Sequence, residues 1–303
     1  MKKSLTQLIA STIMLEYKLK NADLDIDKTC ITHTSLNDDC YKTNNETNLS
    51  RIIYESVLYY SYDQFQLDGG NHGGMFENAF KKKFKFNEMA DETAKLKLGF
   101  YGEALLYSIL KSFYKTETLV CRGYFYDIQK RSEVTGYDCF HLIQNGDNLE
   151  LWFGETKFYE NGIDAVNKVF QNISKAISND YLIDTNFTTI LQNKGNIEDK
   201  KSKIYKILDR WDKALILNMV EELNANNIKL VYPILITYEQ NKNGYDDSIS
   251  KIISHINKEY KDITFDKIGI DYSIFFILMP IEDTNMCKKR IIEWIDKNEP
   301  LMS

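Results

Sequence analysis

The spacing of apolar residues in the middle of the chain predicts a helix, then three strands, then a second helix. The first helix is expected at 90–114, where helical spacing connects Leu96, Phe100, Leu105 and Ile109. Helical spacing returns over 163–177, at Ile163, Val166, Phe170, Ile173 and Ile177. Each pattern places its apolar residues on one face, as in helices that pack on a sheet.

Three strands are expected between these helices, at 119–128, 137–143 and 149–158. The last two alternate apolar and polar residues, as strands with one buried face do. They are joined by Gln144-Asn145-Gly146-Asp147-Asn148, and the Asn-Gly pair favours the tight turn of a β-hairpin. We therefore expect these two strands to pair antiparallel.

Helices and strands also alternate along the C-terminal third. The spacing predicts helices at 204–223, 248–260 and 288–297, and strands at 229–238 and 272–279. Residues 192–203 are mostly polar, and we expect an exposed loop there. Such alternation is typical of an α/β fold, in which helices flank the sheet.

The first 85 residues follow no such order. Short apolar runs alternate with polar stretches, such as the one at 42–48. We expect a smaller N-terminal α+β region at 1–85, outside the α/β unit of 86–303 and free to dock a partner.

Composition and charge narrow the class of protein. Hydrophobic residues make up 43% of the chain and charged residues 27%, which is enough apolar material for a folded core. The net charge of −6 disfavours tight binding of nucleic acid by the chain alone. The five cysteines form no CxxC pair, as expected in a reducing cytoplasm without structural zinc. No apolar stretch reaches the length of a membrane helix, so we expect a cytoplasmic protein without a membrane partner.

The candidate functional residues lie at the end of the third predicted strand and close to it. Alternate side chains of a strand share a face, so Glu155 and Lys157 follow Phe153 on its apolar face. Charged side chains are rarely buried without a partner or a task. The hairpin brings Asp138, at the start of one strand, close to Glu155, at the end of the other. Two carboxylates at one point repel each other, and a divalent cation relieves the repulsion.

Oxygen ligands of this kind suit Mg²⁺ or Mn²⁺. Lys157 beside them is placed to orient or deprotonate an attacking water and to stabilise charge on a phosphate. Glu103, on the preceding helix, adds a third carboxylate on or beside the packing face; the alternative is a surface glutamate that flanks the core. The acid-x-base spacing alone arises repeatedly by chance in a chain this rich in charge, so its weight comes from this context.

These positions resemble the PD-(D/E)XK nuclease superfamily. Its site has a glutamate on the first helix, an aspartate at the start of the second strand and a Glu-x-Lys motif at the end of the third. The matching residues are Glu103, Asp138 and Glu155-Thr156-Lys157, with Tyr137 in place of the proline that gives the motif its name. The resemblance implies a restriction-endonuclease-like core and a metal-dependent nuclease, with Asp138, Glu155 and Glu103 as ligands of Mg²⁺ or Mn²⁺.

More narrowly, three segments look like the HamA family of the Hachiman anti-phage defence system. They are Gly102-Glu103, Gly136-Tyr137-Asp138 and Trp152-Phe153-Gly154-Glu155-Thr156-Lys157-Phe158-Tyr159. The resemblance, over about residues 90–300, implies degradation of DNA with a superfamily-2 helicase, HamB, as partner. The alternatives are a catalytically degenerate module on the same fold, which binds nucleic acid or a protein, and a stand-alone restriction endonuclease.

Several lysines are candidate contacts to nucleic acid, because phosphate neutralisation needs only positioned cations. Lys168 and Lys175 share a helix face with Gln171 between them. The other candidates lie in two basic clusters, at Lys81, Lys82 and Lys83 and at Lys200 and Lys201. Runs of this kind are more often simply solvated.

Overall fold

A computed structural model provides the structure of the chain. It describes residues 1–19, 38–84, 86–121, 126–127, 132–133, 137–146, 148–176, 178, 187–197, 199–214, 218–260, 269–270 and 272–302.

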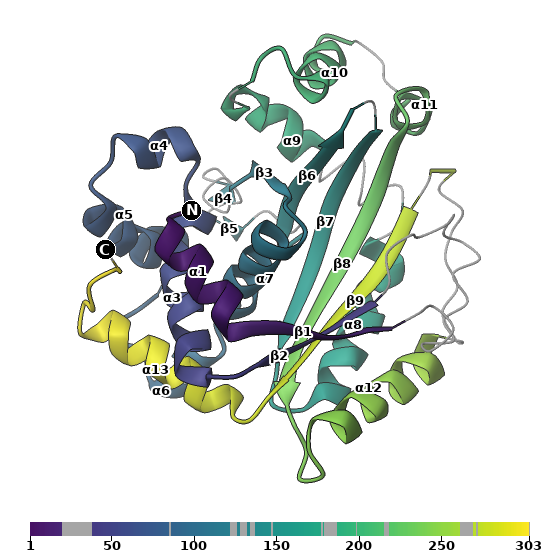
Figure 1. The fold of residues 1–303 in the computed structure, drawn as a ribbon. Helices are drawn as coiled ribbons and strands as arrows, with labels where there is room; N and C mark the ends of the chain where they lie inside the picture. The colour runs from purple at the N-terminus through teal and green to yellow at the C-terminus, as the bar shows by residue number, and fades with distance from the viewer. Residues whose placement is uncertain are drawn as a thin grey trace.

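The fold is mixed α/β, built on a seven-stranded sheet with strand order β1-β2-β9-β8-β7-β6-β3 (Figure 1). The strands are β1 (Ile13–Leu19), β2 (Asp38–Thr43), β9 (Tyr272–Ile281), β8 (Ile228–Glu239), β7 (Asn148–Phe158), β6 (Cys139–Asn145) and β3 (Glu117–Val120). Neighbours from β2 to β7 are parallel, whereas β1, β6 and β3 pair antiparallel with theirs. A small separate sheet contains β4 (Tyr126–Asp127) and β5 (Ser132–Glu133).

Helices cover both faces of the sheet (Figure 1). One face carries α1 (Lys3–Thr12), α3 (Glu46–Ser61), α4 (Gln64–Asp68), α5 (His72–Asn78), the π-helix η1 (Ala79–Lys83), α6 (Glu92–Leu96), α7 (Phe100–Phe113) and α13 (Thr284–Asp296). The other face and its upper end carry α8 (Gly162–Ala176), α9 (Thr188–Asn193), the 3₁₀ turn η4 (Lys194–Asn196), α10 (Lys203–Asp212), α11 (Met219–Ala225) and α12 (Tyr245–Tyr260). Because both faces are covered, β9 is buried along its whole length, which explains its continuous apolar run.

The structure confirms the predicted hairpin. β6 and β7 pair antiparallel from Cys139 opposite Gly154 to Asn145 opposite Asn148. Gly146 in the turn has a φ of +61°, the left-handed region that glycine adopts without strain. The hairpin therefore places the start of β6 beside the end of β7, as the sequence predicts.

Other predicted elements are shorter or divided. The helix expected at 90–114 is two helices, α6 and α7, separated at residues 97–99. The single helix expected at 204–223 is also wrong: α10 ends at Asp212, and α11 starts after Asn218, whose side chain accepts from the Glu221 N–H at 3.3 Å. In the loop expected at 192–203, α9 ends and η4 forms. The strand expected at 119–128 lies partly outside the described residues.

Residues on both sides of the expected boundary at 85 share one sheet and one core. β2 pairs parallel with β9, where Asp39 lies opposite Ile277. The Asp38 side chain accepts from the Phe276 N–H at 2.7 Å, and α3 packs against α7 and α13. Removing residues 1–85 would strip strands from the sheet and uncover the core, so we do not expect residues 86–303 to fold unchanged without them.

Among the described residues, no helix combines the length and the apolar character that crossing a membrane requires.

Candidate active site

Asp138 is held across the β6–β7 hairpin by two backbone contacts. Its N–H donates to the Gly154 carbonyl oxygen at 2.8 Å. Its carboxylate Oδ2 accepts from the Thr156 N–H, also at 2.8 Å. The carboxylate therefore lies over the end of β7, between the residues of the Glu-x-Lys motif.

A close helix–strand approach brings Glu103 to the same place. Gly102 on α7 faces Thr156, and a Cβ atom at Gly102 would lie 2.6 Å from Thr156 Oγ1. Only glycine allows α7 this close to β7. Glu103, the next residue, is 8% exposed.

Tyr60 joins Glu103 to Asp138. Its hydroxyl oxygen lies 3.0 Å from Glu103 Oε2 and 2.7 Å from the Asp138 carbonyl oxygen. The tyrosine comes from α3, far earlier in the chain, and its ring stacks on Phe84. No pattern in the sequence predicts its role, because a tyrosine in the buried stripe of a helix carries no local sign of a site.

Glu155 and Lys157 lie on the sheet face opposite α7. Lys157 Nζ donates to Glu155 Oε1 and lies 3.3 Å from the Thr156 carbonyl oxygen. The other oxygen of Glu155 accepts from the buried hydroxyl of Tyr232 on β8 at 2.7 Å. Both oxygens of Glu155 thus have partners on its own side of the sheet.

The charges of this group act on one another. Burial raises the pKa of Asp138 to about 7, and the charges of Glu103 and Glu155 also raise it, against Lys157 and the Thr156 N–H. Burial acts to lower the pKa of Lys157, but the carboxylates of Glu155 and Asp138 outweigh it, so this pKa lies above its ordinary value. The other three predicted residues, Glu103, Glu155 and Lys157, are therefore within electrostatic reach of Asp138.

A cavity of about 560 Å³ opens on this group, and we name it the carboxylate cavity. Glu103, Asp138, Thr156 and Lys157 line it, together with Lys288 on α13. Glu155 is not part of its wall.

A divalent cation at this cavity would need oxygen ligands from the residues that line it. In the part of the chain that the structure describes, no three His, Cys, Asp or Glu side chains are arranged to hold a metal ion. Mg²⁺ commonly binds through one or two carboxylates and keeps several waters, so it does not need three protein ligands. Glu103 and Asp138 supply hard oxygen donors to the cavity, and the buried Thr156 Oγ1 there has no hydrogen-bond partner in the part of the chain that the structure describes. These residues fit Mg²⁺ or Mn²⁺.

The other candidate lysines lie away from this cavity. Lys168 donates to Gln171 at 3.0 Å, and Lys175 is exposed on the same helix. Lys200 donates to the Gly195 carbonyl oxygen at 2.6 Å. Lys201, just before α10, lines a surface cleft together with basic residues of that helix.

The basic run on η1 behaves similarly. Lys81 pairs with Glu77 at 2.6 Å, and Lys82 is exposed. Lys83 is half-buried and donates to the Ser61 carbonyl oxygen at 2.5 Å. None of these lysines lines the carboxylate cavity, where the lysines are Lys97, Lys157 and Lys288.

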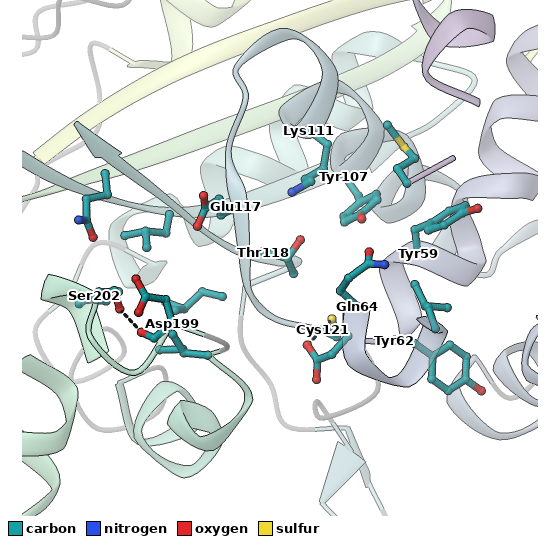
Figure 2. A pocket seen from close by; sticks show the side chains of 18 residues that line it. Tyr59, Tyr62, Gln64, Tyr107, Lys111, Glu117, Thr118, Cys121, Asp199 and Ser202 are labelled. Atoms are coloured by element: carbon teal, nitrogen blue, oxygen red, sulfur yellow. Dashed lines mark hydrogen bonds between the residues drawn. The ribbon is translucent and has the colours of Figure 1, made fainter. Parts of the chain in front are cut away.

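A second cavity, of about 580 Å³, lies further along α7, and we name it the tyrosine cavity (Figure 2). Tyr59, Tyr62 and Tyr107 form part of its wall. Figure 2 shows Lys111 of α7 beside Glu117 and Thr118 of β3, with Asp199 and Ser202 on another wall.

Comparison with known proteins gives one match. The HamA family model matches residues 12–295. Neither the curated proteins nor the solved structures contain a match.

Proposed function

The chain belongs to the HamA family of the Hachiman anti-phage defence system, and we propose that it is a metal-dependent nuclease that hydrolyses DNA phosphodiester bonds. The observation that carries the proposal is the environment of Asp138. This carboxylate is half-buried, and burial together with the charges of Glu103 and Glu155 raises its pKa. A fold gains no stability from such an arrangement, and perturbed carboxylates beside a cavity are typical of active sites. The fold proposed with this activity is the PD-(D/E)XK core.

Each residue has a role in the proposed reaction. Hydrolysis joins a water oxygen to phosphorus, breaks the phosphorus–oxygen bond to the leaving sugar, and builds negative charge on the phosphoryl oxygens. The raised pKa of Lys157 keeps its ammonium form at neutral pH. Of the two roles considered for Lys157, this favours stabilising the developing charge over deprotonating the water. Tyr60 holds Glu103 in place against the start of β6.

Mg²⁺ or Mn²⁺ is the proposed cofactor. Asp138 and Glu103 would hold it from the cavity wall, and Glu155 is the third candidate ligand. When bound, such an ion polarises a phosphoryl oxygen and lowers the pKa of a water.

One observation favours the alternative, a catalytically degenerate module that binds nucleic acid or a protein. Both oxygens of Glu155 are engaged by Lys157 and Tyr232 rather than directed into the cavity. A degenerate module would bind its partner equally well after Glu155→Ala, whereas a nuclease would lose its activity. The same substitution therefore separates the two functions.

The test is cleavage of plasmid DNA by the purified protein, alone and with its partner, in Mg²⁺, Mn²⁺, Ca²⁺ or EDTA. We expect cleavage with Mg²⁺ or Mn²⁺ and none with Ca²⁺, which accepts looser geometry and activates water poorly. Glu155→Ala should abolish cleavage without changing the thermal unfolding temperature by much. Full cleavage by Glu155→Ala would overturn the proposal.

The proposed partner is a superfamily-2 helicase of the HamB type, docked on residues 1–85. Large apolar side chains are exposed there: Phe65 is 51% exposed, and Met14 and Leu15 on the edge strand β1 are 40% and 39% exposed. Since truncation would disrupt the sheet, surface variants replace it as the test. Phe65→Ala with Met14→Ser should abolish co-purification, and Met89→Ala, 91% exposed but outside this region, should not. Undiminished co-purification of the double variant would place the interface elsewhere.

A further inference from the structure

Lys288 presents a buried ammonium group to the carboxylate cavity. The residue lies on α13 and is 8% exposed. Its Nζ donates to the Phe158 carbonyl oxygen at 2.9 Å and lies 4.9 Å from the centroid of the Phe158 ring. The ring of Tyr101 is 5.7 Å away on α7. These contacts fix the ammonium group beside β7, one residue beyond Lys157.

Among the described residues, no counter-charge lies in direct contact with Lys288. An ammonium group has three N–H donors, and within the described ranges the Phe158 carbonyl is its one hydrogen-bond acceptor. No carboxylate in these ranges forms an ion pair with it. Burial lowers the pKa of Lys288, and the more distant charges of Glu160 and Glu239 compensate only in part. A buried cation of this kind costs stability, so its position calls for a task.

The surrounding charges indicate that task. Glu103 and Asp138 line the same cavity and repel an anionic substrate. Lys157 is already paired with Glu155. Lys288 is the buried lysine of the cavity wall that is not paired with a carboxylate, and it keeps N–H donors for a ligand. A phosphate oxygen carries the complementary charge and accepts such hydrogen bonds.

We infer that Lys288 binds a phosphate of the DNA backbone in the carboxylate cavity, next to the bond that is cleaved. This inference rests on the proposed nuclease function and adds a substrate-positioning residue from the C-terminal helix, outside the acid-acid-lysine motif. Lys288 holds the backbone while Lys157 faces the reacting phosphate.

The experiment measures binding of a fluorescent DNA duplex to the full chain carrying Glu155→Gln, over a range of salt concentrations. Lys288→Gln can still donate to the Phe158 carbonyl but loses the charge. We expect about tenfold weaker binding, and a salt dependence of affinity reduced by about one phosphate contact. Lys288→Arg should restore both. The matched control is Lys289→Gln, because Lys289 is exposed and pairs with Glu92 at 2.8 Å; it should bind like the parent.

An unchanged affinity and salt dependence in Lys288→Gln would overturn the inference. Should that variant unfold, acylation of lysines in the parent protein decides instead: DNA should protect the Lys288 amine but not that of Lys289, and equal labelling of Lys288 with and without DNA would contradict the site. Cleavage that persists in Glu155→Gln would contradict the proposed function separately, since DNA affinity is measured independently of cleavage.

Discussion

The carboxylate cavity and the tyrosine cavity are nearly equal in volume, at about 560 and 580 Å³, yet they differ in how charge is arranged. Both use α7 as part of the wall: Glu103 lines the first, and Lys111 the second. In the tyrosine cavity an acid lies within electrostatic reach of a base, and the charge of Glu117 opposes the lowering of the Lys111 pKa by burial. At the carboxylate cavity burial and the charges of two further carboxylates, Glu103 and Glu155, raise the pKa of half-buried Asp138, and Lys157 opposes them only in part.

The difference teaches that cavity volume does not identify the site in this molecule. Charges of opposite sign, such as those of Lys111 and Glu117, stabilise each other and require no further ligand. Gathered carboxylates repel each other and require a cation or a proton. If this contrast in charge is also a contrast in function, substitutions at the two cavities should differ in their effect on cleavage.

The largest effect is expected from single substitutions of charged residues, compared between the two cavities. Asp138→Ala or Lys157→Ala should lower cleavage at least about a hundredfold, because each would remove a charged group of the proposed catalytic site. In the tyrosine cavity, Glu117→Gln and Lys111→Met should leave cleavage nearly unchanged. Single-turnover rates on plasmid DNA measure all four variants. Equal losses in both cavities would show that the variants act through stability and would break the comparison.

A smaller but still large effect is expected from Gly102→Ala. The new methyl group would meet Thr156 Oγ1 at 2.6 Å and push α7 away from β7, displacing Glu103. Overpacking of this kind costs about 1–3 kcal/mol, and misplaced catalytic groups lower rates steeply. We expect cleavage to fall about tenfold, and the thermal unfolding temperature to fall with it.

The control for this substitution is Gly69→Ala, where an added Cβ meets nothing within 4 Å. Thr156→Ala combined with Gly102→Ala should recover the lost stability, because it removes the atoms that clash. A Gly102→Ala protein as active and stable as the parent would show that the close approach of α7 does not position Glu103.

The sequence predicts those residues of the site that lie close together along the chain, and misses those that come from distant elements. Asp138, Glu155 and Lys157 lie on one hairpin. The alternation of side chains along its strands and the residues of its turn are enough to predict that they lie together. Tyr60, Tyr232 and Lys288 reach the same region from α3, β8 and α13. Their positions depend on tertiary packing, which no local pattern encodes.

The N-terminal strands illustrate the same limit. β2 pairs with β9, a strand more than two hundred residues later, so its place in the sheet is set by a long-range pairing. The weak apolar pattern of residues 1–85 predicts a separate region, because it contains no sign of this pairing. Similarly, Asn218 starts a new helix in a segment whose apolar spacing alone predicts continuity.

A moderate effect is expected from Tyr60→Phe, which removes the hydroxyl between Glu103 and the Asp138 backbone. Losing one buried hydrogen bond costs about 1 kcal/mol, so we expect a severalfold lower cleavage rate with little change in DNA affinity. The matched control is Tyr59→Phe, because Tyr59 is the preceding residue but lines the tyrosine cavity. Identical rates for both variants would remove Tyr60 from the site.

The smallest effect is expected on the pH dependence of stability, through His141 on β6. Burial, and then the charge of Lys111, lower the pKa of His141 to about 3. The unfolded chain gains a proton at about pH 6.5 that the folded chain does not bind, so stability falls as pH drops below 6.5. Between pH 6.5 and 5 this amounts to about 2 kcal/mol. Urea unfolding of His141→Gln should show a shallower decline over this range than the parent; parallel curves would contradict it.

The most direct test of the central claim is calorimetric titration of Mg²⁺ into the intact protein and into Asp138→Asn, with Glu117→Gln as the control from the other cavity. If the gathered carboxylates form the functional site, the parent and Glu117→Gln bind Mg²⁺ alike, and Asp138→Asn binds it at least about tenfold more weakly, because the ligand charge is lost. Undiminished Mg²⁺ affinity in Asp138→Asn would contradict the claim and remove Asp138 from any metal site.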